Sequence, residues 1–415
     1  MLHVVLTVTL FGHLALWVAL FNRLHAWPVP RRAIRPTEIF TVVVAAGGLG
    51  WAIYRTLTDH DWFATALTEG PYRVLWVAYV GICCLVGLRV IASWAWRRGW
   101  QVRTDCVLVN HTDRIDVAAE LPESPMRGWS TKLFNCLPGN QMFDLFVHEK
   151  SVAFPDLPAE LDGLSILHLS DLHFTGKITR PFFDYVIDRA NDLDADLVAI
   201  TGDILEHESC YPWLPATLGR LSHRHGAYFV LGNHDKRLDD IARLRRALVE
   251  LNLVDLGQAT HRLRVHGVDV LLAGNELPWF GPAPMVLAPQ DRQFRILLSH
   301  SPDQITWARR RDFHLLLAGH THGGHIRIPG IGPMVCPSRF GVKYACGMFW
   351  EPPTLMHVSR GISGLDPLRF FCPPELTKLD LRRAPRLQSE DRASLSRAPV
   401  HFSVPAELAG ARYHL

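Results

Sequence analysis

The 415-residue sequence predicts a layered α/β domain that follows a block of membrane-spanning helices. Three observations support this prediction. Long apolar segments that contain few charges occupy the first hundred residues. From Leu164 onward, short apolar runs alternate with helix-like stretches, which is the pattern of a layered α/β fold. Most of these short runs are followed by a cluster with Asp, Asn or His side chains, so polar chemistry is concentrated where strands are expected to stop.

Composition limits the classes of function that the chain can have. Lys and Arg number 43 against 40 Asp and Glu, and this even balance gives no support for a nucleic-acid partner. Hydrophobic residues make up 48% of the chain, which excludes disorder throughout. The 8 cysteines show no regular Cys-x-x-Cys spacing, so we expect reduced, buried thiols rather than a disulfide framework or a zinc ribbon.

Residues 1–100 are expected to form a membrane anchor of about three helices. The apolar segments are Leu2–Phe21, Ile39–Tyr54 and Val74–Trp96, the last of which contains Arg89. The first segment has about the length that spans a bilayer core, and tryptophans cluster in this block as in an interfacial belt. The alternatives are a buried helical bundle and, for the first segment only, a cleaved signal peptide.

Basic residues in the loops predict the orientation of the anchor. The positive-inside rule puts the loops after the first and third segments in the cytoplasm. With three spans, the protein is multi-pass in a cell inner membrane and everything after residue 100 is cytoplasmic. If Arg89 stops the third segment from spanning, the remainder lies outside instead. The loop arginines are Arg23, Arg31, Arg32 and Arg35, then Arg97, Arg98 and Arg103.

The rest of the chain divides into three parts. Residues 101–160 predict a juxtamembrane connector with some strand, residues 161–380 an α/β domain, and residues 381–415 a polar tail. Runs that are apolar throughout are typical of strands buried on both faces. The expected strands are Leu164–Leu169, Leu197–Ile200, Tyr228–Leu231, Val268–Ala273, Ile296–Leu298 and Leu315–Ala318, and the expected helices include Arg180–Asp192 and Leu238–Leu251.

Five of the expected strands run into clusters of metal-binding residue types. In open α/β sheets, ligand sites lie beyond the carboxyl ends of strands, so five such ends can meet in one crevice. Each cluster alone is a weak indication, but their order and placement together favour a functional site. The clusters are Ser170-Asp171-Leu172-His173, Thr201-Gly202-Asp203, Gly232-Asn233-His234-Asp235, Ser299-His300-Ser301-Pro302 and Gly319-His320-Thr321-His322-Gly323-Gly324.

The order of these clusters resembles that of the calcineurin-like metallophosphoesterase superfamily over about residues 161–380. Gly323-Gly324, Ser359-Arg360-Gly361 and the apolar N-terminus are most similar to its membrane-associated, YkuE/YaeI-like phosphodiesterase branch. The resemblance implies a four-layer αββα sandwich that holds two divalent metal ions.

The resemblance also implies a role for each residue. His234 contacts the phosphate and protonates or stabilises the leaving oxygen, while Asp235 orients His234 and favours its charged form. Oxygen and imidazole ligands without thiolate suit Mn, Fe, Zn or Co, and two such ions can clamp a phosphoryl group and acidify a bridging water. The implied ligands are Asp171, His173 and His322 for one ion, Asn233, His300 and His320 for the other, and Asp203 as the bridge.

Three nearby residues are left outside the predicted site. His325 stands where this branch often carries Gln, and we expect it to replace an amide hydrogen bond rather than to contact substrate. Glu206 and His207 follow the Asp203 cluster and are equally consistent with the mouth of the site and with a solvated loop. No substrate-binding residue is predicted.

The leading hypothesis is a membrane-tethered phosphodiesterase or pyrophosphohydrolase that attacks phosphorus with a metal-bridging hydroxide. A site held near the bilayer meets amphiphiles in two dimensions, so we expect a lipid-linked or nucleotide-lipid substrate and a role in lipid metabolism. Members of the superfamily include hydrolases of UDP-diacylglucosamine. The alternatives are a phosphomonoesterase or phosphoprotein phosphatase of the same fold and, from another class, a non-catalytic metal-binding scaffold.

Deletion of residues 1–100 is expected to leave a soluble protein that still hydrolyses phosphoesters, because the anchor contains none of the implied ligands. The test is to measure the hydrolysis of bis-p-nitrophenyl phosphate by the deletion protein, with Mn and with chelator, and to determine its bound metal in parallel. A folded, metal-loaded deletion protein without turnover would mean that the anchor belongs to the active machinery.

Overall fold

The structure is a computed structural model that describes residues 2–27, 31–100, 106–290 and 292–384. The chain divides into two compact units. The first comprises Met1–Val102 and Ile328–Lys343, and the second comprises Arg103–Arg327 and Tyr344–Leu415. All but the first four residues of the predicted polar tail lie outside the described residues.

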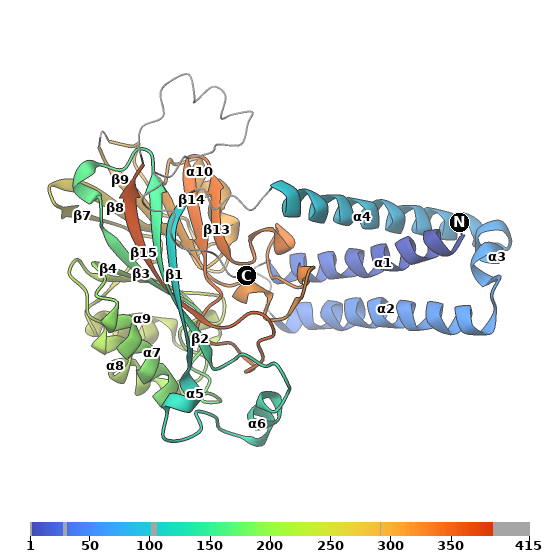
Figure 1. Cartoon of the computed structure of the whole chain (residues 1–415), viewed down its shortest axis with the longest axis horizontal. Coiled ribbons are helices and arrows are strands. Elements are labelled where there is room, and N and C mark those ends of the chain that lie inside the picture. The colour runs from blue at the N-terminus through green and yellow to red at the C-terminus, as the bar shows by residue number, and fades with distance from the viewer. Residues whose placement is uncertain (1, 28–30, 101–105, 291, 385–415) are drawn as a thin grey trace. The chain divides into compact units, whose positions relative to one another are not determined.

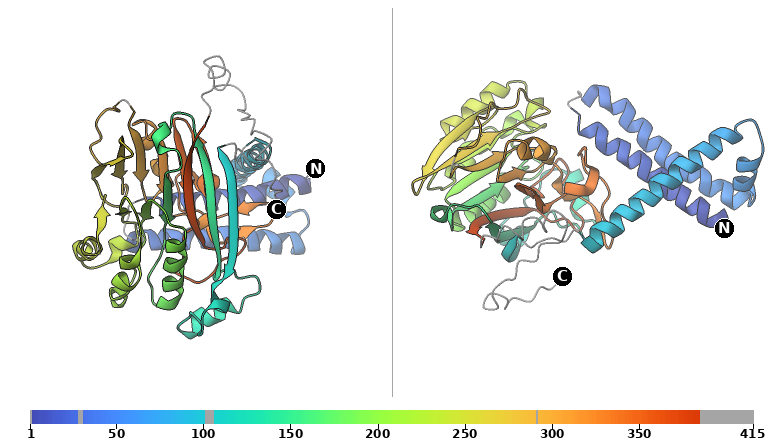
Figure 2. Two further views of the ribbon diagram at one scale, coloured as in Figure 1. Left: turned by 60° about the vertical axis from the view of Figure 1, so that its left-hand side comes forward. Right: turned by 90° about the horizontal axis from the view of Figure 1, so that it is seen from above.

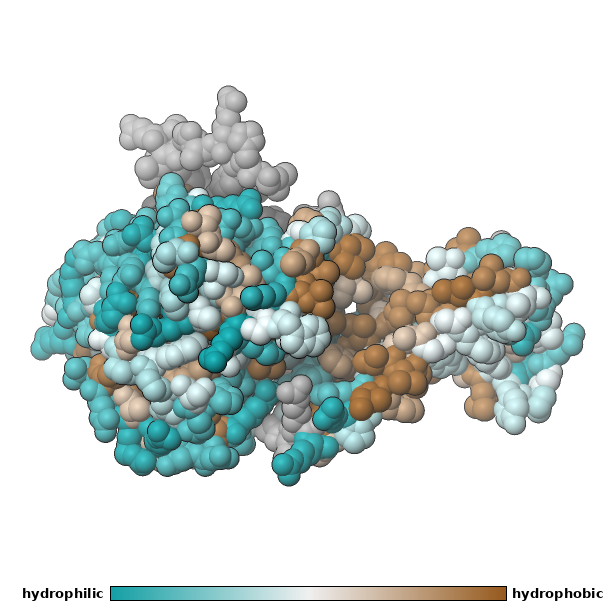
Figure 3. All heavy atoms as spheres, turned by 90° about the horizontal axis from the view of Figure 1, so that it is seen from below, coloured by the Kyte–Doolittle hydropathy of each residue, from teal (hydrophilic) through white to brown (hydrophobic). Residues whose placement is uncertain are grey.

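Three long helices dominate the first unit: α1 (Leu2–His25), α2 (Arg31–Thr58) and α4 (Arg73–Trp100) (Figure 1). Short α3 (Trp62–Thr68) lies between the last two. The segments Leu2–His25, Arg32–Thr58 and Arg73–Ala95 are long and apolar enough to cross a membrane, and hydrophobic side chains cover much of their surface (Figure 3). The prediction of three apolar helices is confirmed, and α4 continues through Arg89 without a break.

Two sheets form the body of the second unit (Figure 2). The larger has the strand order β1-β2-β15-β3-β4-β5-β6 and the smaller has the order β13-β14-β10-β9-β8-β7. Neighbouring strands from β3 to β6 are parallel, as are those of the run β8-β9-β10-β14. The strands of the larger sheet are β1 (Val107–Asp116), β2 (Asp144–Phe154), β3 (Ser165–Leu169), β4 (Leu197–Thr201), β5 (Ala227–Val230), β6 (Leu253–Asp255) and β15 (Glu375–Arg383). Those of the smaller sheet are β7 (Thr260–Val265), β8 (Val268–Gly274), β9 (Phe294–Leu298), β10 (Leu315–Ala318), β13 (Gly347–Glu351) and β14 (Thr354–Val358).

The sheets pack face to face with helices on their outer faces, which confirms the predicted layered α/β fold. One core lies between the sheets and contains residues such as Ile166 and Leu298, one from each sheet. A second core lies under α7 (Arg180–Asp192), α8 (Trp213–Ala216) and α9 (Ile241–Glu250). A third packs α10 (Ile305–Arg309) against the smaller sheet. Strands β3, β4, β5, β9 and β10 are buried along their whole length, as their apolar sequences predict.

The predicted connector contributes two strands to the larger sheet. Strands β1 and β2 pair antiparallel, and β2 pairs in parallel with β15 near the end of the described chain. Strand β1 is exposed along most of its length and contains several charged residues, so its sequence lacks the apolar signal of a strand. Short helices α5 (Val117–Glu120) and α6 (Trp129–Asn135) separate β1 from β2.

Residues Ile328–Lys343 belong to the first unit although they lie inside the predicted 161–380 domain. The segment begins in a short turn between β11 (Arg327–Ile328) and β12 (Gly332–Pro333). The buried side chain of Asn22 in α1 accepts a hydrogen bond from the Cys336 N–H at 3.0 Å and donates one to the Met334 carbonyl at 3.4 Å. The chain therefore leaves the α/β unit after β10, packs with the N-terminal helices and returns.

The eight cysteines are free. Five of them are buried, whereas Cys136 is exposed, which differs from the expectation of buried thiols. Cys136 follows α6 directly, in the segment predicted as a connector.

Candidate metal centre

The candidate site lies beyond the carboxyl ends of parallel strands from both sheets. Strands β3, β4 and β5 of the larger sheet and β9 and β10 of the smaller sheet each end two or three residues before a predicted site residue. Seven side chains that were predicted as ligands come together there in two groups that share one residue. They are Asp171, His173, Asp203, Asn233, His300, His320 and His322.

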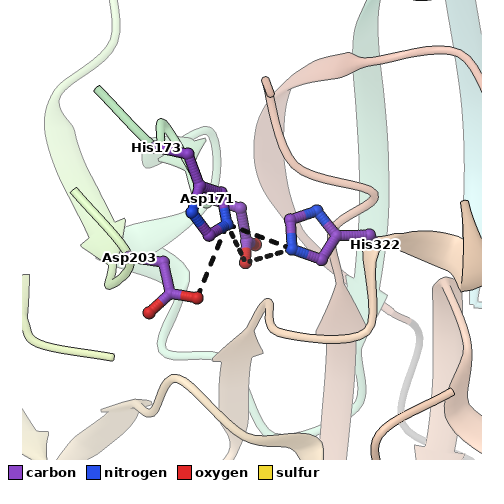
Figure 4. Close-up of side chains that lie close together, drawn as sticks. All are labelled: Asp171, His173, Asp203 and His322. Atoms are coloured by element: carbon purple, nitrogen blue, oxygen red, sulfur yellow. Dashed lines mark hydrogen bonds and ion pairs between the residues drawn. The ribbon is translucent and has the colours of Figure 1, made fainter. Parts of the chain in front are cut away.

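The first group consists of Asp171, His173, Asp203 and His322 (Figure 4). Each offers a ligand atom within 4.8 Å of the others, and all four side chains are buried. Nε2 of His322 lies 3.3 Å from Oδ1 of Asp171 and 3.2 Å from Nε2 of His173. Nε2 of His173 lies 3.5 Å from Oδ2 of Asp203.

The second group consists of Asp203, His300 and His320, with Asn233 beside them. Nε2 of His300 lies 3.2 Å from Oδ2 of Asp203 and 3.1 Å from Oδ1 of Asn233. Nδ1 of His300 lies 2.7 Å from the Thr201 carbonyl, to which it donates, so Nε2 is the nitrogen that faces Asp203. Because Asp203 belongs to both groups, one carboxylate connects them.

These side chains fit a pair of divalent cations. Oδ2 of Asp203 is buried and accepts no hydrogen bond from any residue that the structure describes, yet it faces the ring nitrogens of His173 and His300. Burying a carboxylate oxygen without a hydrogen bond costs free energy of folding unless a cation lies beside it. Imidazole nitrogens together with carboxylate and amide oxygens are the ligands that Zn, Mn, Fe and Co use in proteins.

The charges of the two groups are strongly coupled. Burial would raise the pKa of Asp203, but the neighbouring His300 and His234 hold that pKa well below its usual value. Burial would lower the pKa of His300, but Asp203 raises it to about 9. Burial raises the pKa of Asp171. Because the pKa of His300 is raised, binding of a metal ion at its Nε2 would release a proton at neutral pH.

The backbone of the site is strained where the ligands lie. Five of the seven predicted ligands have positive φ angles between 45° and 71°, a conformation that residues other than glycine seldom adopt. Such strain persists only where the surrounding contacts impose it, and it concentrates at functional sites. Gly202 also has positive φ, and a Cβ there would lie 2.6 Å from the Gly232 nitrogen. The five residues are Asp171, His173, Asp203, His320 and His322.

The structure corrects the predicted role of Asp235. Its carboxylate does not contact the His234 ring in the described chain but accepts backbone N–H groups, from Gly232 at 2.8 Å and from Asp203 at 2.9 Å among others. Burial and the nearby Asp203 raise the pKa of Asp235 to about 7. Asp235 therefore acts on the backbone of the site, and another carboxylate lies beside His234.

That carboxylate is Glu206, whose place in the sequence is equally consistent with a solvated loop. Oε1 of Glu206 lies 3.0 Å from Nδ1 of His173 and is in direct contact with Nδ1 of His234. Its side chain is 11% exposed, and burial would raise its pKa, but the two histidines lower it to about 2. A carboxylate behind a metal-binding histidine fixes the ring and makes it a better ligand. In the sequence, only the position of Glu206 three residues after Asp203 could have suggested that it belongs to the site.

Three more side chains contact the first group: Arg369, Ser170 and His325. Nη2 of Arg369 lies 3.3 Å from Nδ1 of His322, and the guanidinium is buried. Ser170 donates a hydrogen bond to Oδ2 of Asp171 at 2.6 Å and receives one from Thr201 at 2.7 Å. The ring of His325 lies against that of His322, with centroids 4.2 Å apart. Ser170 and Thr201 belong to the strand-end clusters of the sequence and His325 follows the last one, whereas Arg369 lies in none of them.

Residues 164–324 match the family model of the calcineurin-like phosphoesterases. The chain is 31% identical to the uncharacterized metallophosphoesterase YkuE of Bacillus subtilis over 242 residues, which are 54% of this chain and 82% of that protein. It is 30% identical to a transmembrane protein with metallophosphoesterase domain of Bos taurus, over 55% of each chain. It is 27% identical to phosphodiesterase YaeI of Escherichia coli, over 59% of this chain and 90% of YaeI. The chain thus spans most of the two bacterial relatives and about half of the bovine one.

His234→Ala is expected to retain metal while turnover falls by about 10²- to 10⁴-fold, the usual loss for a group that transfers a proton. Asp203→Ala is expected to lose metal and turnover together, because Asp203 belongs to both groups. Elemental analysis and hydrolysis assays measure both, with the exposed His207→Ala as control. Equal loss of metal in the two site variants would mean that His234 is itself a ligand.

Glu206→Gln is expected to lower metal affinity or turnover by about 10- to 100-fold, the usual effect of removing a carboxylate behind a ligand histidine. Glu208→Gln, in the same loop but exposed and paired with Arg243, serves as the matched control. Metal titration and steady-state kinetics of both variants measure the difference. Identical behaviour of the two variants would show that the Glu206 contacts have no effect on the site.

Proposed function

Because the chain belongs to the calcineurin-like phosphoesterase family, we propose that this metal-dependent phosphoesterase is a membrane-tethered phosphodiesterase or pyrophosphohydrolase. The proposed substrate is lipid-linked or a nucleotide lipid. The observation that supports the proposal most directly is the meeting of two buried ligand groups at Asp203, in a chain whose N-terminal helices are long and apolar enough to span a membrane.

The proposed ligand sets are the two groups described above, with Asp203 in both. When bound, two divalent ions stabilise negative charge on phosphoryl oxygens and lower the pKa of a water molecule. The protein holds the His173 and His300 rings through Nδ1, by Glu206 and the Thr201 carbonyl, so that each Nε2 faces Asp203. This arrangement keeps the ligand atoms in place before substrate arrives.

His234 is proposed to donate a proton to the leaving oxygen. Its ring lies at a right angle to that of His173, with centroids 4.7 Å apart, which puts it at the edge of the first group. Burial lowers the pKa of His234, whereas Glu206 at Nδ1 favours the imidazolium. An anionic phosphoester at Nε2 would favour the imidazolium further, so the proton is available where the leaving group forms.

The N-terminal helices bear on the kind of substrate that the site meets. We propose that residues 1–100 hold the catalytic residues of 161–380 at the cytoplasmic face, because Arg23 lies in the last turn of α1 and Arg32 and Arg35 lie near the start of α2. The bovine relative is named a transmembrane protein and the E. coli relative a phosphodiesterase. A tethered site searches for its substrate in the plane of the bilayer, which favours a phosphoester on a lipid.

The test uses the full chain in lipid nanodiscs with bis-p-nitrophenyl phosphate, p-nitrophenyl phosphate and UDP-diacylglucosamine, each with Mn and with chelator. The expected result is metal-dependent turnover of the bis-ester above that of the mono-ester, and turnover of the nucleotide lipid. Asp203→Ala controls for contaminating phosphatases. Preference for the mono-ester would favour a phosphomonoesterase, and bound metal without any turnover would contradict the proposal.

A further inference from the structure

The segment Ile328–Lys343 exposes apolar side chains at a density that is unusual for a loop in water. Ile331 is 56% exposed, Val335 41% and Phe340 40%, and Ile328 and Met334 are exposed as well. Arg339 and Lys343 lie in the same segment, and it contains no acidic residue. Exposed apolar side chains mixed with cations are typical of segments that lie at a membrane interface.

The structure also shows at which level of the helices this segment lies. Its Met334 and Cys336 backbone groups are hydrogen-bonded to the buried side chain of Asn22, in the last turn of α1. Arg23 follows Asn22, and Arg32 and Arg35 lie at the start of α2. The segment is therefore attached where the apolar helices end and the basic residues begin, which is the level of the lipid headgroups.

We propose that Ile328–Lys343 is an interfacial loop that inserts its apolar side chains into the headgroup region of the bilayer, an inference that rests on the membrane tether of the proposed function. The irregular backbone of the loop limits how deeply it can enter the bilayer. Residues 334–340 form no helix or strand, and Pro329, Pro333 and Pro337 have no N–H to donate. Irregular backbone is not tolerated in lipid-exposed hydrocarbon, but water and headgroups can satisfy it at the interface.

The loop restricts which phosphoesters the site can reach. Ile328 follows His322 by six residues, and an extended chain of that length reaches at most about 20 Å. Any arrangement of the two units therefore keeps His322 within that distance of the inserted loop. The substrate class that this favours is a phosphoester in the headgroup region of the same bilayer, attacked without extraction of its acyl chains.

The test places a fluorescent amino acid at Ile331 of the full chain in nanodiscs of phosphatidylcholine and phosphatidylglycerol. The matched control carries it at Met285, which is 88% exposed and belongs to the second unit. Lipids spin-labelled at the headgroup or at a shallow acyl position are expected to quench position 331 and not position 285, while aqueous iodide is expected to quench position 285 more strongly. Equal lipid quenching at both positions, or protection of position 331 from both quenchers as in a protein interface, would overturn the proposal.

A second pair of variants separates this inference from the proposed function. Ile331→Asp with Val335→Asp is expected to leave bis-p-nitrophenyl phosphate turnover unchanged and to reduce turnover of UDP-diacylglucosamine in the same nanodiscs, whereas Met285→Asp with Leu287→Asp changes neither. Unchanged turnover of the nucleotide lipid in the loop variant would contradict the restriction of substrate by the loop. Lipid quenching at position 331 in a protein that hydrolyses none of the three phosphoesters would support the loop and contradict the proposed function alone.

Discussion

The geometry of the site depends on one buried carboxylate, that of Asp235, which joins the loops after β4 and β5. It accepts backbone N–H groups from Gly232 and from Asp203, Ile204 and Leu205, at 2.8 to 3.0 Å. These four bonds hold Asp203 at a positive φ and aim its own carboxylate between the two ligand groups. Burial of two carboxylates this close is costly, as the raised pKa of Asp235 shows, and the backbone donors offset part of that cost.

The imidazole rings of His173 and His300 are also held in place by hydrogen bonds with neighbouring groups. Glu206 on His173 and the Thr201 carbonyl on His300 each occupy Nδ1, so both rings present Nε2 to Asp203. The partners differ chemically, but each fixes the tautomer and the plane of the ring. The loop after β10 carries His320 and His322 and then runs into Ile328–Lys343, so one strand end connects the candidate metal centre with the segment that packs against the N-terminal helices.

Local sequence determined much of the fold. Strands β3, β4, β5, β9 and β10 could be predicted to within one or two residues, because strands buried on both faces are mostly apolar. Helices α1, α2 and α4 could be predicted because a lipid-facing helix requires an apolar run of a length set by the bilayer. The site residues were found because parallel strands place their carboxyl ends at one edge, where side chains that follow an apolar run converge.

Contacts between distant segments decided the rest, and no local pattern encodes them. Strands β1 and β15 contain charged residues and are held by pairing with β2, so neither has a strand signal of its own. Glu206 and Arg369 became part of the site only when neighbouring strands brought their loops together, Glu206 at the larger sheet and Arg369 at the smaller one. The Asp235 carboxylate accepts backbone N–H groups rather than a hydrogen bond from the adjacent His234. The sequence by itself therefore determined which residues gather at the candidate site, since strand burial and chain order are local properties. Which neighbour orients each of them was decided by tertiary structure, because most of these hydrogen bonds join loops that only the folded chain brings within bonding distance.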